Sequence, residues 1–248
     1  MSPGFRFARL HIEAIGGVAG DMLLAAFIDL GADSLPITRA LASLGISGLS
    51  LDVSRVELAG EAACSVRSIA TTSTPAHHTL REITALIDRV DASAEARARA
   101  RRVFSVLTEA EARVHGGTPE SVHLHEVGQL DSVLDVLGIA IALHALGDPA
   151  MSCSALPSGH GTVETQHGRL DCPVPAVCEI ATRAGIPLVD VPVVGETITP
   201  TGIAVVAEAC ERFGDAPAGD ATGVGIGAGT RRFPDRPNIV RVVGYDRV

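Results

Sequence analysis

The chain has 248 residues, enough for one large domain or two small ones. Hydrophobic residues make up 46% of it, which permits a sizeable buried core and excludes a disordered chain. Its 20 basic and 29 acidic residues give a net charge of −9, and only 3% of residues are aromatic. Nucleic-acid binding needs a positive surface and, for single strands, aromatic stacking platforms, so this composition argues against a nucleic-acid partner.

The cysteines and the apolar segments bear on where the protein works. The five cysteines are odd in number and never spaced CxxC, unlike a disulfide framework or a zinc ribbon. The N-terminus lacks the apolar core of a secretory leader. The longest apolar stretch, residues 130–146, contains Asp131, Asp135 and His144 and is too short and too charged to span a membrane. We expect a cytoplasmic protein with reduced thiols and no membrane partner.

Hydrophobic periodicity predicts strands interleaved with helices. Alternating apolar residues predict strands at 5–14, 49–58 and 64–69, the last two joined as a hairpin over 59–61. Helices are predicted at about 23–30, 36–44, 80–90, 94–115, 129–146, 178–184 and 202–213, followed by strands at 221–228 and 239–245. Thr79 and Glu82 have the spacing of a capping box at the third helix.

This order predicts an α/β fold of α+β character, with helices packed on a mixed sheet. The polar segment 71–78 is the best candidate for an internal boundary. It would separate an N-terminal α/β part, 1–72, from a helical and α/β part, 73–248. A single continuous domain, 1–248, is the alternative.

The densest chemical signal is a short window of histidines and acids. His123 and His125 share one side if the segment is extended, and Glu126 follows directly. Asp131 and Asp135 are four residues apart, so they lie on one face of a helix that is otherwise nearly all apolar. Buried carboxylates need a partner or a cation, and this mixed N/O set suits nickel, zinc or iron. Helix capping by Asp131 and pairing of Asp135 with an arginine would be a purely structural alternative.

A second signal is a glycine-rich turn between the first strand and the first helix. It contains Gly16, Gly17 and Gly20, flanked by Glu13 and Asp21. Backbone amides at such a strand–helix turn can face an anion, although the pattern is neither GxGxxG nor a Walker A sequence. The carboxylates would repel a bare phosphate, so either one could hold a bridging metal. A tight structural connection explains the same residues.

Two further patterns lie in the last fifty residues. Thr199, Thr201 and Gly202 precede a helix, where hydroxyls and amides either bind an oxyanion or cap the helix. Alternating glycines leave one face of a strand bare, which indicates close approach by another backbone or by a ligand. These glycines are Gly223, Gly225, Gly227 and Gly229.

Taken together, these motifs resemble the LarC-type nickel-insertion proteins over nearly the whole chain. The resemblance rests on their order and spacing rather than on any single motif. The matching segments are 13–22, 123–128 with Asp131 and Asp135, 199–202, 225–230 and 237–238.

The resemblance implies a nickel-inserting lyase of the metallochelatase type. Such enzymes insert Ni²⁺ into a pyridinium bis-thiocarboxylate mononucleotide, with CTP hydrolysis, in the last step of nickel-pincer cofactor synthesis. Full-length members carry a further C-terminal domain associated with the nucleoside triphosphate, and this chain stops at Val248. We therefore expect a separate C-terminal-domain protein to supply CTP and its magnesium or manganese. A homo-oligomer is left open.

Within this reading, each predicted site has a role. His123, His125 and Glu126 receive nickel, with Asp131 and Asp135 as further ligands or as orienting groups. The glycine turn and residues 199–202 hold the phosphate of a small nucleotide-like substrate. Glu13 or Asp21 removes the ring proton as the carbon–nickel bond forms.

Two other functions fit the same residues. The His/Asp cluster could activate water in a metal-dependent phosphohydrolase-like enzyme. The chain could also be a non-catalytic nickel carrier or scaffold.

Overall fold

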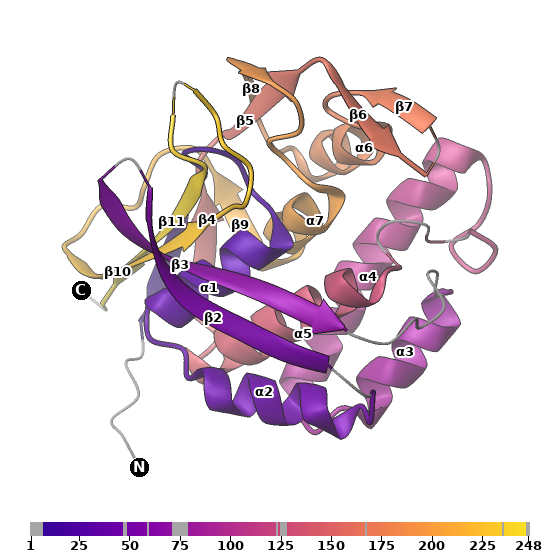
Figure 1. The fold of residues 1–248 in the computed structure, drawn as a ribbon, viewed down its shortest axis with the longest axis horizontal. Helices are drawn as coiled ribbons and strands as arrows, with labels where there is room; N and C mark the ends of the chain where they lie inside the picture. The colour runs from indigo at the N-terminus through magenta and orange to yellow at the C-terminus, as the bar shows by residue number, and fades with distance from the viewer. Residues whose placement is uncertain are drawn as a thin grey trace.

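The structure is a computed structural model. The structure describes residues 7–46, 49–58, 60–70, 79–122, 124, 128–166, 168–234 and 236–246, apart from the side chain of Ala70. Within these ranges, the predicted α/β fold with a mixed sheet and packed helices is confirmed (Figure 1).

A seven-stranded mixed sheet forms the centre of the fold. Its strand order is β2-β3-β10-β11-β1-β4-β9. β1 runs parallel to β4 and β4 parallel to β9, whereas β11 is antiparallel to both β1 and β10. The strands are β1 (Arg9–Glu13), β2 (Leu49–Leu58), β3 (Glu61–Ala70), β4 (Ala150–Cys153), β9 (Cys210–Phe213), β10 (Ala221–Ala228) and β11 (Ile239–Tyr245).

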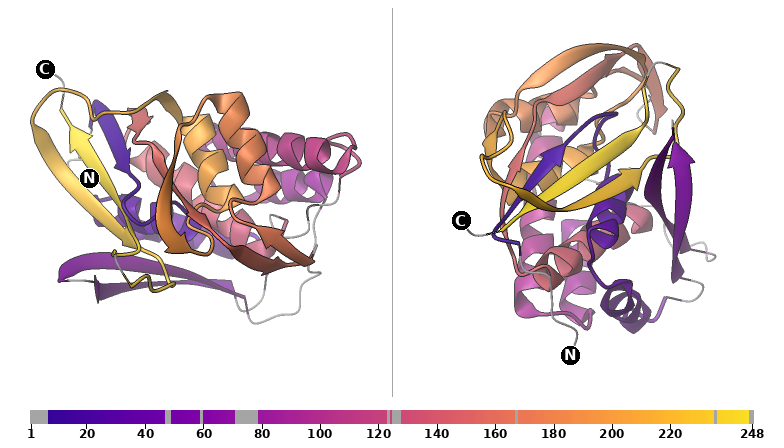
Figure 2. Two further views of the ribbon diagram at one scale, coloured as in Figure 1. Left: turned by 90° about the horizontal axis from the view of Figure 1, so that it is seen from above. Right: turned by 90° about the vertical axis from the view of Figure 1, so that its left-hand side faces the viewer.

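The helices lie on one side of the β1, β10 and β11 strands, which stand in front of them in the right-hand view of Figure 2. Next to the sheet is α1, which packs against β10, β3 and α5. The helices are α1 (Gly20–Asp29), α2 (Ser34–Ser43), α3 (Leu80–Arg89), α4 (Ala94–His115), α5 (Leu130–Ala145), α6 (Pro175–Ala184) and α7 (Pro200–Ala209).

Two small two-stranded sheets extend the fold between β4 and α7. β5 (Leu156–His160) pairs in parallel with β8 (Leu188–Val194). β6 (Thr162–Thr165) and β7 (Gly168–Asp171) form a hairpin.

The alternating glycines of β10 make room for a helix backbone. A Cβ at Gly227 would lie 1.9 Å from the carbonyl oxygen of Met22, and one at Gly225 would lie 2.1 Å from that of Ala26. No side chain fits between β10 and α1 at these positions. The backbone alternative predicted for the bare strand face is therefore the one observed here.

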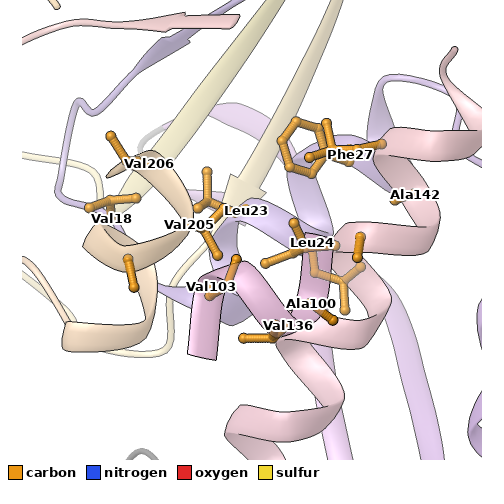
Figure 3. Close-up of a cluster of buried hydrophobic side chains, with 14 of the residues drawn as sticks. Val18, Leu23, Leu24, Phe27, Ala100, Val103, Val136, Ala142, Val205 and Val206 are labelled. Carbon is orange, nitrogen blue, oxygen red and sulfur yellow. The ribbon is translucent and has the colours of Figure 1, made fainter. Parts of the chain in front are cut away.

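The hydrophobic core lies between the sheet and the helices and among the helices themselves. Leu23, Leu24 and Phe27 of α1 are fully buried. Figure 3 shows these α1 side chains in one cluster with side chains of α4, α5 and α7, among them Ala100, Val103, Val136, Ala142, Val205 and Val206. The near-continuous apolar sequence of α5 follows from this central position, because α5 is covered on most sides.

Most predicted elements are confirmed, including the β2–β3 hairpin and the capping box. The helix predicted at 202–213 is wrong at its C-terminal end. It ends at Ala209, and Cys210–Phe213 becomes β9 at the edge of the sheet, parallel to β4. Pairing with β4 outweighs the local helical pattern of this segment.

The main sheet draws on both parts of the chain that segment 71–78 was predicted to separate. Gly227 of β10 pairs with Cys64 of β3. None of the helices within the described ranges has the length and apolarity needed to cross a bilayer.

Replacing Gly227 with alanine tests the contact between α1 and β10. The added methyl group would overlap the Met22 carbonyl, so α1 must move, and we expect the free energy of unfolding to fall by about 2 kcal/mol or more. Urea denaturation measures this change. The control is Gly117→Ala, since only Ser121 Oγ lies within 4 Å of that position. Equal stability of the two variants would contradict the proposed packing.

Candidate functional site

A cavity of about 310 Å³ lies where the first turns of three helices meet. α1, α5 and α7 each contribute residues from their N-terminal ends, and β3 forms the remaining wall. The lining is rich in carboxylates and hydroxyls: Ala19, Gly20, Asp21, Val66, Arg67, Ser68, Asp131, Ser132, Asp135, Thr199 and Thr201.

The glycine-rich turn fixes the start of α1 beside the start of α7. Val18 forms a parallel bridge with Ile198, through its amide to the Thr197 carbonyl (2.9 Å) and through its carbonyl to the Thr199 amide (3.0 Å). At Gly17, φ is +141° and a Cβ would lie 1.9 Å from the Thr197 oxygen. Only glycine fits this turn, and the turn aligns the two helix N-termini.

Gly20, the first residue of α1, lets α5 approach. A Cβ there would lie 2.9 Å from Oδ2 of Asp135 and 3.1 Å from Cγ2 of Thr201. Because Gly20 has no side chain, α1, α5 and α7 can come together at this point.

Three carboxylates face this cavity. Asp21 and Asp131 both occupy the second position of a helix, and each accepts a hydrogen bond from the next backbone amide, at 2.8 Å from Met22 and 2.7 Å from Ser132. Asp135, one turn further along α5, accepts from the hydroxyl of Ser68 at 3.2 Å.

The proximity and burial of these acids disfavour their charged forms. Burial, and then the nearby Asp21 and Asp131, hold the pKa of Asp135 well above its usual range, although the Ser68 hydrogen bond opposes the shift. Burial also raises the pKa of Asp21 against the effect of backbone hydrogen bonds, and Asp131 adds to the rise. A divalent cation in the cavity would reverse this cost, because it favours ionised carboxylates.

The structure brings six of the residues predicted from sequence into this one cavity. Three are the carboxylates Asp21, Asp131 and Asp135. The others are Gly20, Thr199 and Thr201.

The remaining predicted glycines have packing positions. A Cβ at Gly16 would lie 2.4 Å from the Pro237 oxygen, and one at Gly202 would lie 2.5 Å from the Val18 oxygen. The Gly202 amide donates to Thr199 Oγ1 at 3.1 Å, so Thr199 caps α7. Gly16, Gly17 and Gly202 thus border the turn rather than the cavity.

Glu13 lies at the end of β1, apart from the cavity lining. Its carboxylate accepts from Arg241 at 3.0 Å, and the same guanidinium reaches Glu61 at 3.4 Å. The other predicted metal ligands, His123, His125 and Glu126, lie outside the described residues.

Sequence reasoning missed the wall formed by β3. Val66, Arg67 and Ser68 belong to a strand with no recognisable motif, and only the sheet topology brings them opposite α5. Ser132 was within the predicted window, next to Asp131, but a single serine carries no specific signal.

Among the residues that the structure describes, no three His, Cys, Asp or Glu side chains are arranged to hold a metal ion. The carboxylates at the cavity would need further ligands from a substrate or from another part of the chain.

The profile of the nickel insertion protein family matches residues 10–246. The chain belongs to this family. It is 42% identical over 237 residues to a "Putative nickel insertion protein" of Geobacter sp. (strain M21), covering 96% of this chain and 61% of the relative. A relative of the same name from Geotalea uraniireducens (strain Rf4) is 43% identical over 236 residues, covering 94% of this chain and 60% of the relative.

This member of the nickel insertion family thus spans about three-fifths of the curated relatives that it matches. A third relative, from Rhodopirellula baltica, is 38% identical over 94% of this chain and 58% of its own length. No solved structure gave a significant match.

The raised pKa of Asp135 predicts how stability depends on pH. The folded protein holds this proton more tightly than the unfolded chain does, so the free energy of unfolding should fall as pH rises from about 4 through the raised pKa. Asp135→Asn removes the ionisation, and the variant should gain on the order of 1 kcal/mol relative to wild type towards pH 8. Urea denaturation from pH 3 to pH 8 with a chelator measures the difference.

Asp148→Asn serves as a control of opposite sign. Burial tends to raise the pKa of Asp148, but hydrogen bonds from His144 and Arg99 outweigh it and hold this pKa below its usual range. This variant should therefore lose stability relative to wild type as pH rises. Parallel pH curves for wild type and Asp135→Asn would contradict the account of the cavity.

Proposed function

We propose that this chain inserts nickel into a pyridinium bis-thiocarboxylate mononucleotide, the last step of nickel-pincer cofactor synthesis. The observation that carries the proposal is the convergence of three carboxylates, several hydroxyls and three helix N-termini on one cavity, in a chain of the nickel insertion family. A nickel-bound nucleotide contains both a cation and a phosphate, and this cavity has groups suited to each.

The phosphate would lie towards the start of α7. The N-terminal ends of α1, α5 and α7 carry the positive ends of their helix dipoles, which favour an anion. Thr199 and Thr201 add hydroxyls, and Arg67 on β3 adds a positive charge. The phosphate thus meets donors on one side and the cation on the other.

Nickel would enter as cargo on the carboxylate side. Asp131 and Asp135 offer oxygen ligands, and His123, His125 and Glu126 would complete the set. Oxygen ligands are harder than the sulfur atoms of a thiocarboxylate, so nickel gains by moving from the protein to the substrate. Weak holding by the carboxylates suits a delivery site better than a storage site.

The carbon–nickel bond requires that a ring C–H bond loses its proton while the carbon electron pair passes to nickel. We assign Asp21 as the acceptor of that proton, because it lines the cavity and its raised pKa strengthens it as a base. Glu13, the other predicted base, forms an ion pair with Arg241 and does not line the cavity, so we assign it a structural role in the sheet.

The nucleoside triphosphate requirement would be met by a partner. We propose that a C-terminal-domain partner supplies CTP with magnesium or manganese. We further propose that the reaction, a lyase-class metal insertion, takes place in the cytoplasm.

The direct test incubates the purified chain with Ni²⁺, CTP and the thiolated mononucleotide, with and without the C-terminal two-fifths of a relative. Mass spectrometry detects the nickel-containing product. We expect product with the partner present, and a loss of about 10²-fold or more in rate for Asp21→Asn.

Asp148→Asn is the matched control, since Asp148 forms an ion pair with Arg99 and does not line the cavity. Absence of product in both arms, with no nickel retained, would refute the proposal. Nickel retained without product would identify a carrier, and metal-stimulated hydrolysis of simple phosphoesters without product would identify a phosphohydrolase.

A further inference from the structure

The face of the main sheet turned away from the helices carries a second group of polar residues. Arg9 and His11 alternate on β1 and so point to the same face. In register, His11 pairs with Ser152 of β4, and Ser152 pairs with Arg212 of β9. Their strands, β1, β4 and β9, lie at one end of the sheet order, away from the β2–β3 hairpin.

Two of these residues are buried where an apolar pair would be expected. His11 is 2% exposed and Ser152 is 8% exposed, and Nδ1 of His11 lies 2.8 Å from Oγ of Ser152. Buried parallel strands usually carry valine or isoleucine at such positions. Burial lowers the pKa of His11, so the folded protein bears a cost for placing an imidazole here. Glu13 and Asp215 raise this pKa, and Arg212 lowers it.

A cavity of about 180 Å³ reaches Ser152, the hydrogen-bond partner of His11. Its polar lining consists of Arg9, Ser152, Glu211 and Arg212, closed by Pro217. The β4–β9 register shifts between Met151 and Ser152, and this irregularity brings both Glu211 and Arg212 to the wall. Such bulges are typical of strands that direct a side chain into a site.

The guanidinium groups at this cavity are available to a ligand. Arg9 donates from Nη2 to the neutral Ala218 carbonyl at 3.2 Å, and no carboxylate among the described residues forms an ion pair with it. Arg212 forms no ion pair with any part of the chain that the structure describes. If Nδ1 of His11 carries the proton, it donates to Ser152, and the serine hydroxyl is then free to donate into the cavity.

We propose that this cavity binds a small phosphate monoester that also carries a hydroxyl group. Arg9, Arg212 and the Ser152 hydroxyl hold the phosphate, since guanidinium groups match its paired oxygens. The Glu211 carboxylate accepts a hydrogen bond from the ligand's hydroxyl group. This hydrogen bond makes the site bind the phosphate monoester more tightly than inorganic phosphate. The site lies on the opposite face of the sheet from the carboxylate cavity and is independent of the function proposed above.

Calorimetric titration with glycerol 3-phosphate and with inorganic phosphate tests the proposal. We expect saturable binding of glycerol 3-phosphate, weakened about tenfold or more by Arg212→Gln. Arg81→Gln, which removes an exposed arginine from α3, should leave the affinity unchanged. Glu211→Gln should reduce the preference for glycerol 3-phosphate over inorganic phosphate.

Asp135→Asn separates this site from the carboxylate cavity. The same affinity in this variant supports the second site, whereas loss of binding places the ligand in the carboxylate cavity and overturns the proposal. No saturable binding to the wild type, or equal affinity of wild type and Arg212→Gln, overturns it as well.

Discussion

The backbones of α1 and β10 are in close contact, and this contact fixes the position of α1 on the sheet. Side chains are excluded there, since carbonyl oxygens of α1 occupy the space that a Cβ on Gly225 or Gly227 would need. This contact sets the depth of α1 on the sheet. The glycine turn before α1 is in turn tied to the segment before α7. Once α1 is fixed in this way, Gly20 meets Asp135 and the three helix N-termini enclose the cavity.

Two electrostatic effects oppose each other in the cavity: one disfavours the ionised carboxylates and the other favours them. Burial is the main reason that the pKa of Asp135 is raised, and repulsion from the nearby Asp21 and Asp131 adds to the rise. The helix N-termini around them favour negative charge. A protein selected only for stability would place apolar side chains here, so these carboxylates mark a candidate functional site.

The sequence was informative wherever a short local rule determines the structure. The Thr79 capping box and the β2–β3 hairpin follow from residues close together in the chain, and both are confirmed. The i, i+4 spacing predicted a shared face for Asp131 and Asp135, and both line the cavity.

The remainder depended on contacts between distant segments. The helix predicted to reach Phe213 becomes strand β9, because β4 offers an unpaired edge there. Ser68 and Arg67 reach the cavity only through the pairing of β3 with β10, more than 150 residues later in the chain. No local pattern reveals such a pairing. The polar pair His11 and Ser152 likewise arises from strand order alone.

A nickel-edge anomalous difference map from crystals grown with Ni²⁺ and the thiolated mononucleotide would show directly whether the carboxylate cavity receives nickel. We predict a peak in the cavity between α1 and α5, within coordination distance of a carboxylate oxygen of Asp131 or Asp135 (about 2.0–2.2 Å). The substrate phosphate should lie towards the start of α7. A nickel peak elsewhere on the protein, with this cavity left empty, would contradict the account.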